Sequence, residues 1–201
     1  MTLWLVMSVS YGFGQGVIRW NITFDGFPNI PPGTDIGVTN YSESAMLFRP
    51  ISNGDQFGRM GGGRSGFPEN GTAYIIQGAF DSLACTADFG RFGLYSVDLS
   101  EFSILYQEPK VIQFVGYKPG GQIVTTEFTT DGIIDGTGPL EDFQTFYFDS
   151  RFEDIIRLEV PTPGIALDNL VVQSVPEPQT GLLLLTAAAV LFRRFFNFHT
   201  R

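Results

Sequence analysis

The stretch KVIQFVGYKPGGQIVTTEFT, residues 110–129, decides the fold class of this chain. Its two halves, 110–117 and 122–129, are rich in β-branched and aromatic residues, which favour strands. Between them lie Pro119, Gly120 and Gly121, a composition typical of a tight turn. We therefore predict a β-hairpin over 110–129.

Further strand-like segments lie on both sides of this hairpin. They are at 17–24, 45–48, 73–77, 143–148, 154–160 and 165–172. In 154–160 the residues Ile156, Leu158 and Val160 alternate with polar neighbours, which predicts that these three share a buried face. Residues 88–99 give no clear pattern, and the glycine-rich stretch 53–71 is typical of a long irregular loop.

The composition supports an all-β reading of the whole chain. Its 201 residues include 24 Gly, 12 Pro and 20 Phe, and helical periodicity is almost absent. Many short strands separated by turn residues favour a two-sheet β-sandwich, jelly-roll-like in layout. We predict that residues 15–174 form this single domain.

Charge and rare residues exclude several classes of function. The formal net charge of −9 argues against a nucleic-acid binder, which needs clustered Lys and Arg. The chain has one Cys and one His, so multi-Cys metal sites and disulfide frameworks are excluded. His199 lies at the extreme C-terminus, where it cannot serve a Ser-His-Asp hydrolase site in the domain.

The C-terminal segment 175–201 has a different character. It begins with Val175, Pro176, Glu177 and Pro178, continues with the apolar run GLLLLTAAAVLF at 181–192, and then carries Arg193 and Arg194. The apolar run predicts a short transmembrane helix, and the two arginines predict a stop on the cytoplasmic side. The alternative is a buried core helix.

The first residues suggest export. Residues 3–9 are apolar, and Gly12 and Gly14 are small residues suited to cleavage before Gln15. We therefore predict a signal peptide over 1–14, although no basic residue precedes Arg19. The alternative is a plain N-terminal strand.

The three ordered parts of 175–201 resemble the PEP-CTERM sorting signal of Gram-negative bacteria. The resemblance rests on the Val-Pro-Glu-Pro motif at 175–178, the apolar helix at 181–192 and the arginine pair. It implies export, transient anchoring in the inner membrane, and processing near Pro176-Glu177-Pro178 by an exosortase. It also implies an exopolysaccharide setting at the cell surface or in the extracellular matrix.

A second, shorter resemblance concerns the ends of the domain. Residues 22–26 and 166–172 resemble the first and last strands of jelly-roll modules that bind carbohydrate. In such modules these strands lie side by side, and their acidic residues can share a structural Ca²⁺ ion. The resemblance implies a calcium site at Asp25, Asp168 and Asn169. The alternative is that these side chains cap turns.

Few residues are candidates for ligand contact within the domain. Arg59 and Arg64 lie in the predicted loop and are candidates for contact with an acidic glycan. The alternative is that this stretch is a surface loop with no ligand. Aromatic side chains that can stack on sugars, or pack in the core, are Trp20, Tyr74, Tyr95, Tyr106 and Tyr117. The candidates for a glycosidase carboxylate pair are Glu141, Asp142, Asp149, Glu153 and Asp154, and the alternative is that these residues are solvated surface groups.

These observations favour one function. We expect an exported, non-enzymatic β-sandwich protein that is structural or glycan-associated. It has no certain cofactor, and structural calcium is only what the second resemblance implies. The alternative is an envelope carbohydrate-active enzyme that uses an Asp/Glu pair.

Overall fold

The computed structural model confirms an all-β two-sheet sandwich, and it describes residues 17–25, 33–52, 55–78, 81–135 and 142–175. These residues form strands and two short 3₁₀ helices. In chain order the elements are β1 (Arg19–Ile22), β2 (Asp35–Val38), β3 (Tyr41–Glu43), β4 (Met46–Arg49), β5 (Phe57–Met60), β6 (Tyr74–Gln77), β7 (Leu83–Ala87), β8 (Phe92–Glu101), η1 (Ile104–Tyr106), β9 (Val111–Tyr117), β10 (Ile123–Thr129), β11 (Gln144–Tyr147), η2 (Ser150–Phe152), β12 (Arg157–Val160) and β13 (Ile165–Ser174).

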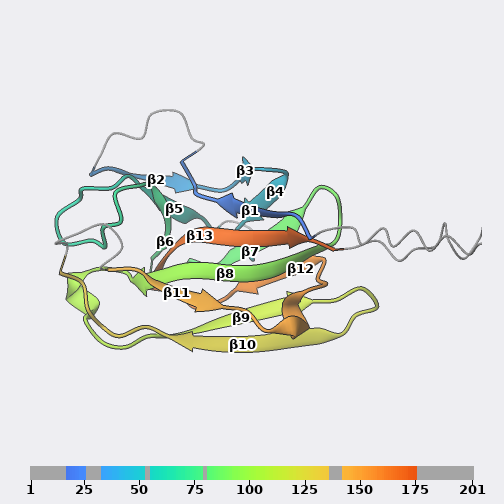
Figure 1. The fold of residues 1–201 in the computed structure, drawn as a ribbon. Coiled ribbons are helices and arrows are strands. Elements are labelled where there is room, and N and C mark those ends of the chain that lie inside the picture. Colours follow the sequence, from blue (N-terminus) through green and yellow to red (C-terminus); the bar gives the residue numbers. More distant parts are fainter. Residues whose placement is uncertain (1–16, 26–32, 53–54, 79–80, 136–141, 176–201) are drawn as a thin grey trace, which may run out of the picture. The chain divides into compact units, whose positions relative to one another are not determined.

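The strands make two antiparallel sheets that pack face to face (Figure 1). The seven-stranded sheet has the order β11-β8-β13-β6-β5-β2, and β1 also pairs with β13. The six-stranded sheet has the order β10-β9-β12-β7-β4-β3. The first and last strands, β1 and β13, therefore lie side by side, with Trp20 opposite Val172, as the second resemblance implies.

The predicted hairpin is confirmed as β9 and β10. The two strands pair over their full length, from Val111 opposite Thr129 to Tyr117 opposite Ile123. Gly120 and Gly121 turn the chain with φ angles of 89° and 88°, a region that side chains rarely adopt.

Two local predictions were wrong. Ile156 is exposed and Ile155 is fully buried in its place, because Ile155 forms a bridge with Phe92 before β12 begins. The stretch 53–71 is not wholly a loop, since it contains β5. Gly58 in β5 packs against Ile76, where a Cβ would lie 2.4 Å from Cγ2, so this glycine serves strand packing and not a turn.

The main hydrophobic core fills the space between the two sheets. It includes Phe48, Phe57, Ile75, Phe114 and Leu167. Cys85 also lies in this core, where burial raises the pKa of its thiol, which supports a packing role for this residue.

A second, smaller cluster lies on the outer face of the seven-stranded sheet. Its buried members are Met60, Tyr74, Ile76, Phe143 and Ala166, and Phe67 and Phe102 pack against it. Met60, Tyr74 and Ile76 alternate along β5 and β6 with residues that face the main core, which places them on the opposite side of the sheet. The segment 61–73 therefore covers this part of the outer face.

Contacts group Ile18–Val175 into one compact unit. The predicted signal peptide (1–14), sorting motif (Pro176, Glu177, Pro178), membrane helix (181–192) and stop (Arg193, Arg194) all lie outside the described residues, and Val175 is the last residue described. In the part of the chain that the structure describes, no helix has the length and apolar character needed to cross a membrane.

Candidate functional site

The outer face of the seven-stranded sheet carries a row of polar side chains. Along β11, Thr145 and Tyr147 are exposed while Phe146 between them packs against the main core. Thr145 lies directly opposite Asp98 in β8, and Tyr147 lies opposite Ser96. Because directly opposed residues of antiparallel strands share a face, all four side chains are on the outer side.

Hydrogen bonds join this row across four strands. Asn21 Nδ2 in β1 donates to Asn169 Oδ1 in β13 over 2.8 Å. Asn169 Nδ2 donates to Asp98 Oδ2 over 2.9 Å, and Thr145 Oγ1 donates to Asp98 Oδ1 over 2.6 Å. We call Asn21, Asn169, Asp98 and Thr145 the transverse row. Amide, hydroxyl and carboxylate groups can each make more than one hydrogen bond, so the row can also bind the hydroxyls of a ligand.

A bulge in β13 brings Asn169 into the row. The pairing of β13 with β8 shifts register between Asp168 and Val171, and Asn169 has a φ of 46°. Asn tolerates this left-handed conformation better than most residues. The bulge therefore directs the Asn169 amide along the sheet surface, where it connects β1 with β8.

Two tyrosines stand next to the transverse row. The rings of Tyr95 and Tyr147 meet edge to face, with centroids 5.5 Å apart and planes at 79°. The Arg19 guanidinium carbon lies 3.5 Å from the centroid of the Tyr95 ring, and Arg19 Nε donates to Gln173 Oε1 over 3.3 Å. Tyr147 is 62% exposed. Tyr95 and Arg19 thus support Tyr147, whose ring is available for stacking.

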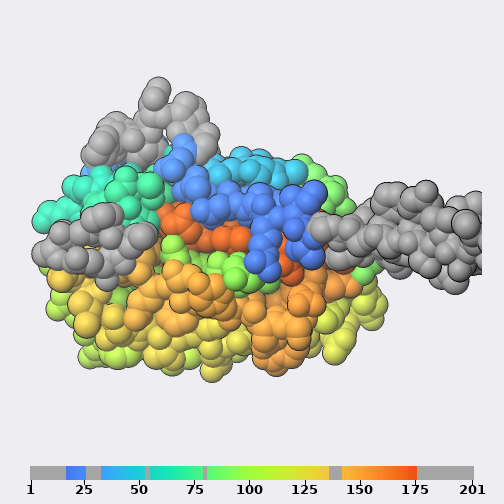
Figure 2. Space-filling model, in the orientation of Figure 1, coloured from blue at the N-terminus to red at the C-terminus, as the bar shows by residue number. Residues whose placement is uncertain are grey.

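The strands that carry the transverse row and the two tyrosines border a shallow hollow (Figure 2). Ser96 and Asp98 in β8 are buried, whereas Tyr147 in β11 is exposed. Figure 2 shows β13 and β8 recessed between β1 on one side and β11 on the other. The arrangement gives a hydrogen-bonding floor with an aromatic edge.

Asp168 in β13 binds the segment 61–73 through hydrogen bonds from Asn70 and Thr72. Its carboxylate accepts hydrogen bonds from Asn70 Nδ2, from Thr72 Oγ1 at 3.0 Å and from the backbone N–H of Asn169 at 2.7 Å. The side chain is fully buried, and this burial raises its pKa to about 7 even though the hydrogen bonds favour the charged form.

The groups implied as calcium ligands do not fit a calcium site well. Hydrogen-bond donors surround the Asp168 carboxylate, and the Asn169 amide oxygen accepts from Asn21. Asp25 accepts from the backbone N–H of Ala73 over 3.1 Å. Among the described residues, no three His, Cys, Asp or Glu side chains group closely enough to hold a metal ion. The calcium site stays a prediction.

Arg59 is a buried arginine near the carboxylates of Asp25, Glu43 and Asp168. Arg59 lies in β5, is 2% exposed, and donates from Nε to the carbonyl oxygen of Phe24. Burial lowers its pKa, while the charges of Tyr41, Asp25, Glu43 and Asp168 oppose this shift. The prediction that Arg59 contacts a glycan from a loop is therefore wrong, because the side chain is enclosed by the fold.

Most of the other residues predicted to contact a ligand lie away from the transverse row or are engaged by neighbouring residues. Arg64 pairs with Asp35 over 2.9 Å and lies 4.5 Å from the Phe67 ring centroid. Tyr74 is fully buried, and Trp20 packs against the core. Tyr117 donates to Glu159 Oε2 over 2.8 Å on the six-stranded sheet. Of the aromatic candidates, Tyr95 and Tyr106 thus remain for ligand contact.

Sequence reasoning missed Tyr147, Thr145 and Asp98. Side chains alternate between the two faces of a strand, so the strand predicted at 143–148 could have identified Tyr147 as facing away from Phe146 and Phe148. It could not identify the partner strand, because pairing with β8 depends on the fold of the whole domain.

The predicted carboxylate pair finds little support in the geometry. Asp149 and Asp154 are engaged by Arg151 and Arg91, and Asp142 accepts from the backbone N–H of Glu69 over 2.8 Å. Hydrogen bonds from Arg151 lower the pKa of Asp149, whereas a general acid in glycoside hydrolysis needs a raised one. Glu141 lies outside the described residues.

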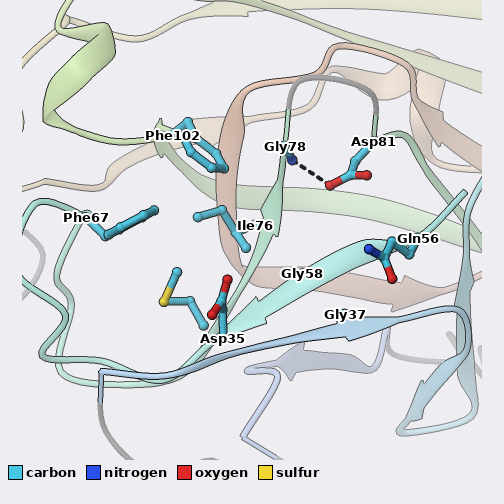
Figure 3. A pocket seen from close by; sticks show the side chains of 10 residues that line it. Asp35, Gly37, Gln56, Gly58, Phe67, Ile76, Gly78, Asp81 and Phe102 are labelled. Carbon is cyan, nitrogen blue, oxygen red and sulfur yellow. Dashed lines mark hydrogen bonds between the residues drawn. The ribbon is translucent and has the colours of Figure 1, made fainter.

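A separate cavity of about 200 Å³ lies over β2, β5 and β6. Figure 3 shows Phe67 and Phe102 on one side of it and Gln56 and Asp81 on the other, with Asp81 Oδ2 accepting from the backbone N–H of Gly78. Ligand pockets usually enclose about 300–1,000 Å³. This cavity is smaller than that range, so it is a weak candidate for a ligand site.

Comparison with known proteins gives only distant likenesses. No protein-family model and no curated protein matches the sequence. A solved family 29 carbohydrate-binding module is 17% identical, with a TM-score of 0.36 over 79% of this chain and 89% of that one. The xylanase 10B of Clostridium thermocellum, solved as CBM22-1 and GH10 modules with xylohexaose, is 13% identical, with a TM-score of 0.34 over 79% of this chain and 28% of that one.

Proposed function

We propose that this chain is a non-catalytic glycan-binding protein whose binding face is the outer side of the seven-stranded sheet. The observation that carries the proposal is the transverse row, hydrogen-bonded across four strands beside the exposed ring of Tyr147. Sugars present apolar ring faces and many hydroxyls, so they are bound by aromatic rings next to clustered polar groups.

The geometry favours neutral hydroxyl-rich ligands over other classes at this site. The floor consists of amides, a hydroxyl and a carboxylate that is already engaged on both oxygens. None of these groups is an activated nucleophile, and the acidic Asp98 opposes the binding of anions at the floor. Binding without turnover is the expected result.

The first test measures binding of neutral oligosaccharides to the purified full chain and its variants. Tyr147→Ala removes the exposed ring and should weaken binding about tenfold or more, while Tyr147→Phe should retain it. Tyr117→Ala is the matched control, because Tyr117 lies on the other sheet.

Equal losses of oligosaccharide affinity in Tyr147→Ala and Tyr117→Ala would contradict a binding face on the outer side of the seven-stranded sheet. Release of shorter sugars that stops after one Asp or Glu substitution would favour the carbohydrate-active enzyme instead.

We also propose that residues 175–201 direct this protein to the cell surface through exosortase processing and a transient inner-membrane anchor. The support is the order of the three sequence elements quoted above. In this proposal the folded domain binds glycan and the C-terminal segment determines its location.

A further inference from the structure

A second pocket lies at the end of the sandwich where β8 ends and β13 begins. It encloses about 400 Å³ and is lined by Phe102, Tyr106, Lys110, Pro163 and Gly164. This volume is within the usual range for small-ligand pockets. The pocket is separate from the hollow beside Tyr147, because Phe102 follows the end of β8 and Tyr95 lies near its start.

The aromatic walls of this pocket are held in place by neighbours. The Phe102 ring meets the rings of Phe67 and Tyr106 edge to face, at centroid distances of 5.6 and 6.1 Å. The backbone N–H of Tyr106 donates to the Ser103 carbonyl oxygen over 2.9 Å, which fixes the backbone from which the Tyr106 ring extends. Tyr106 is nevertheless 60% exposed, so part of its surface is available for contact.

Lys110 brings a positive charge to these walls. Its backbone N–H donates to Thr130 Oγ1, and the Thr130 N–H donates back to the Lys110 carbonyl, each over 3.1 Å. Its Nζ would lie 3.4 Å from a Cβ built on Gly164, which places the ammonium beside this glycine at the pocket. None of the ion pairs among the described residues includes Lys110.

An ammonium group that forms no ion pair with the described carboxylates favours an anionic ligand, particularly in a chain of net charge −9. The aromatic rings beside it favour a ligand with an apolar face. A carboxylate-bearing sugar has both properties, since its carboxylate can pair with the ammonium while its ring packs against Tyr106.

We propose that the Phe102–Tyr106–Lys110 pocket binds a hexuronate unit of an acidic glycan. The inference extends the proposed function, because it gives the protein an acidic-sugar site in addition to the neutral face. The two sites are tested by different residues and different probes, so either can fail alone.

The experiment titrates the full chain with trigalacturonate and with its methyl ester, which keeps the rings and removes the charge. Lys110→Gln should weaken binding of trigalacturonate about tenfold to a hundredfold, the worth of a charged hydrogen bond, and should leave the ester unchanged. Lys118→Gln is the matched control, since it removes the same charge just beyond the far end of β9, about 26 Å away along the strand.

Tyr106→Ala should weaken the binding of trigalacturonate and of its methyl ester alike, because both pack a sugar ring against the Tyr106 ring. Acetate alone should compete poorly, which distinguishes a sugar from a simple carboxylate. Equal effects of Lys110→Gln and Lys118→Gln, or equal binding of acid and ester to the unmodified chain, would overturn the inference.

Discussion

At the scale of single residues, Asp168 makes stability depend on pH. Burial raises its pKa to about 7 in the folded chain, against about 3.9 in an unfolded one. The folded state therefore holds the proton more tightly between these values. This group's contribution to stability is fully present below about pH 4 and is lost as the pH rises through about 7.

We expect the free energy of unfolding in urea to fall as the pH rises from 4 to 8, by at most about 1.4 kcal/mol per pH unit from this residue. Asp168→Asn should flatten this part of the profile. Thr72→Val removes a hydrogen bond that favours the charged carboxylate, so it should raise the pKa of Asp168 further. The fall in unfolding free energy should then extend to higher pH. A profile that keeps the same slope in Asp168→Asn would show that another group is responsible.

The residues of the binding face were only partly predictable. Tyr95 was identified as an aromatic candidate, and Asp168 and Asn169 were identified as polar residues of the closing strand. Their roles were not predictable, because Asn169 joins the transverse row through a bulge that depends on pairing with both β1 and β8. Arg59 was misassigned because its flanking glycines suggest a loop, whereas the side chain is held inside the fold by Phe24.

At the scale of elements, the β9–β10 hairpin depends on glycine in its turn. Gly121 has a φ of 88°, and a Cβ built there would meet nothing within 4 Å. Gly121→Ala should therefore cost about 1–2 kcal/mol of unfolding free energy from backbone conformation alone. Gly121→Asn should cost less, since Asn tolerates positive φ better. Equal stability of all three chains in urea unfolding would contradict a strained turn.

Strands were predictable from the sequence where the local residue pattern and the tertiary structure favour the same conformation. The hairpin combines alternating strand residues with a glycine turn, and its partner strand is the next one along the chain. β5 was hidden in the glycine-rich stretch 53–71, because Gly58 is required by the close approach of Ile76 from β6. Such a contact leaves no periodic signal in the sequence.

At the scale of the whole molecule, binding and sorting should be separable. Residues Ile18–Val175 form a compact unit, which contains both proposed binding sites. The proposed sorting elements follow this unit in the sequence. A change in one region should therefore leave the function of the other intact.

Replacing Pro176, Glu177 and Pro178 by alanine tests this separation in the producing cell. We expect the variant to accumulate in the inner-membrane fraction, because the proposed processing motif is lost while the apolar run 181–192 is kept. Its affinity for the glycans bound by the unmodified chain should be unchanged after extraction. Replacing Asn197, Phe198 and His199 by alanine is the matched control, since these residues lie beyond the arginine pair and should not affect release. Normal release of the 176–178 variant would contradict processing at this motif, whereas reduced glycan affinity in that variant would contradict the independence of the binding unit.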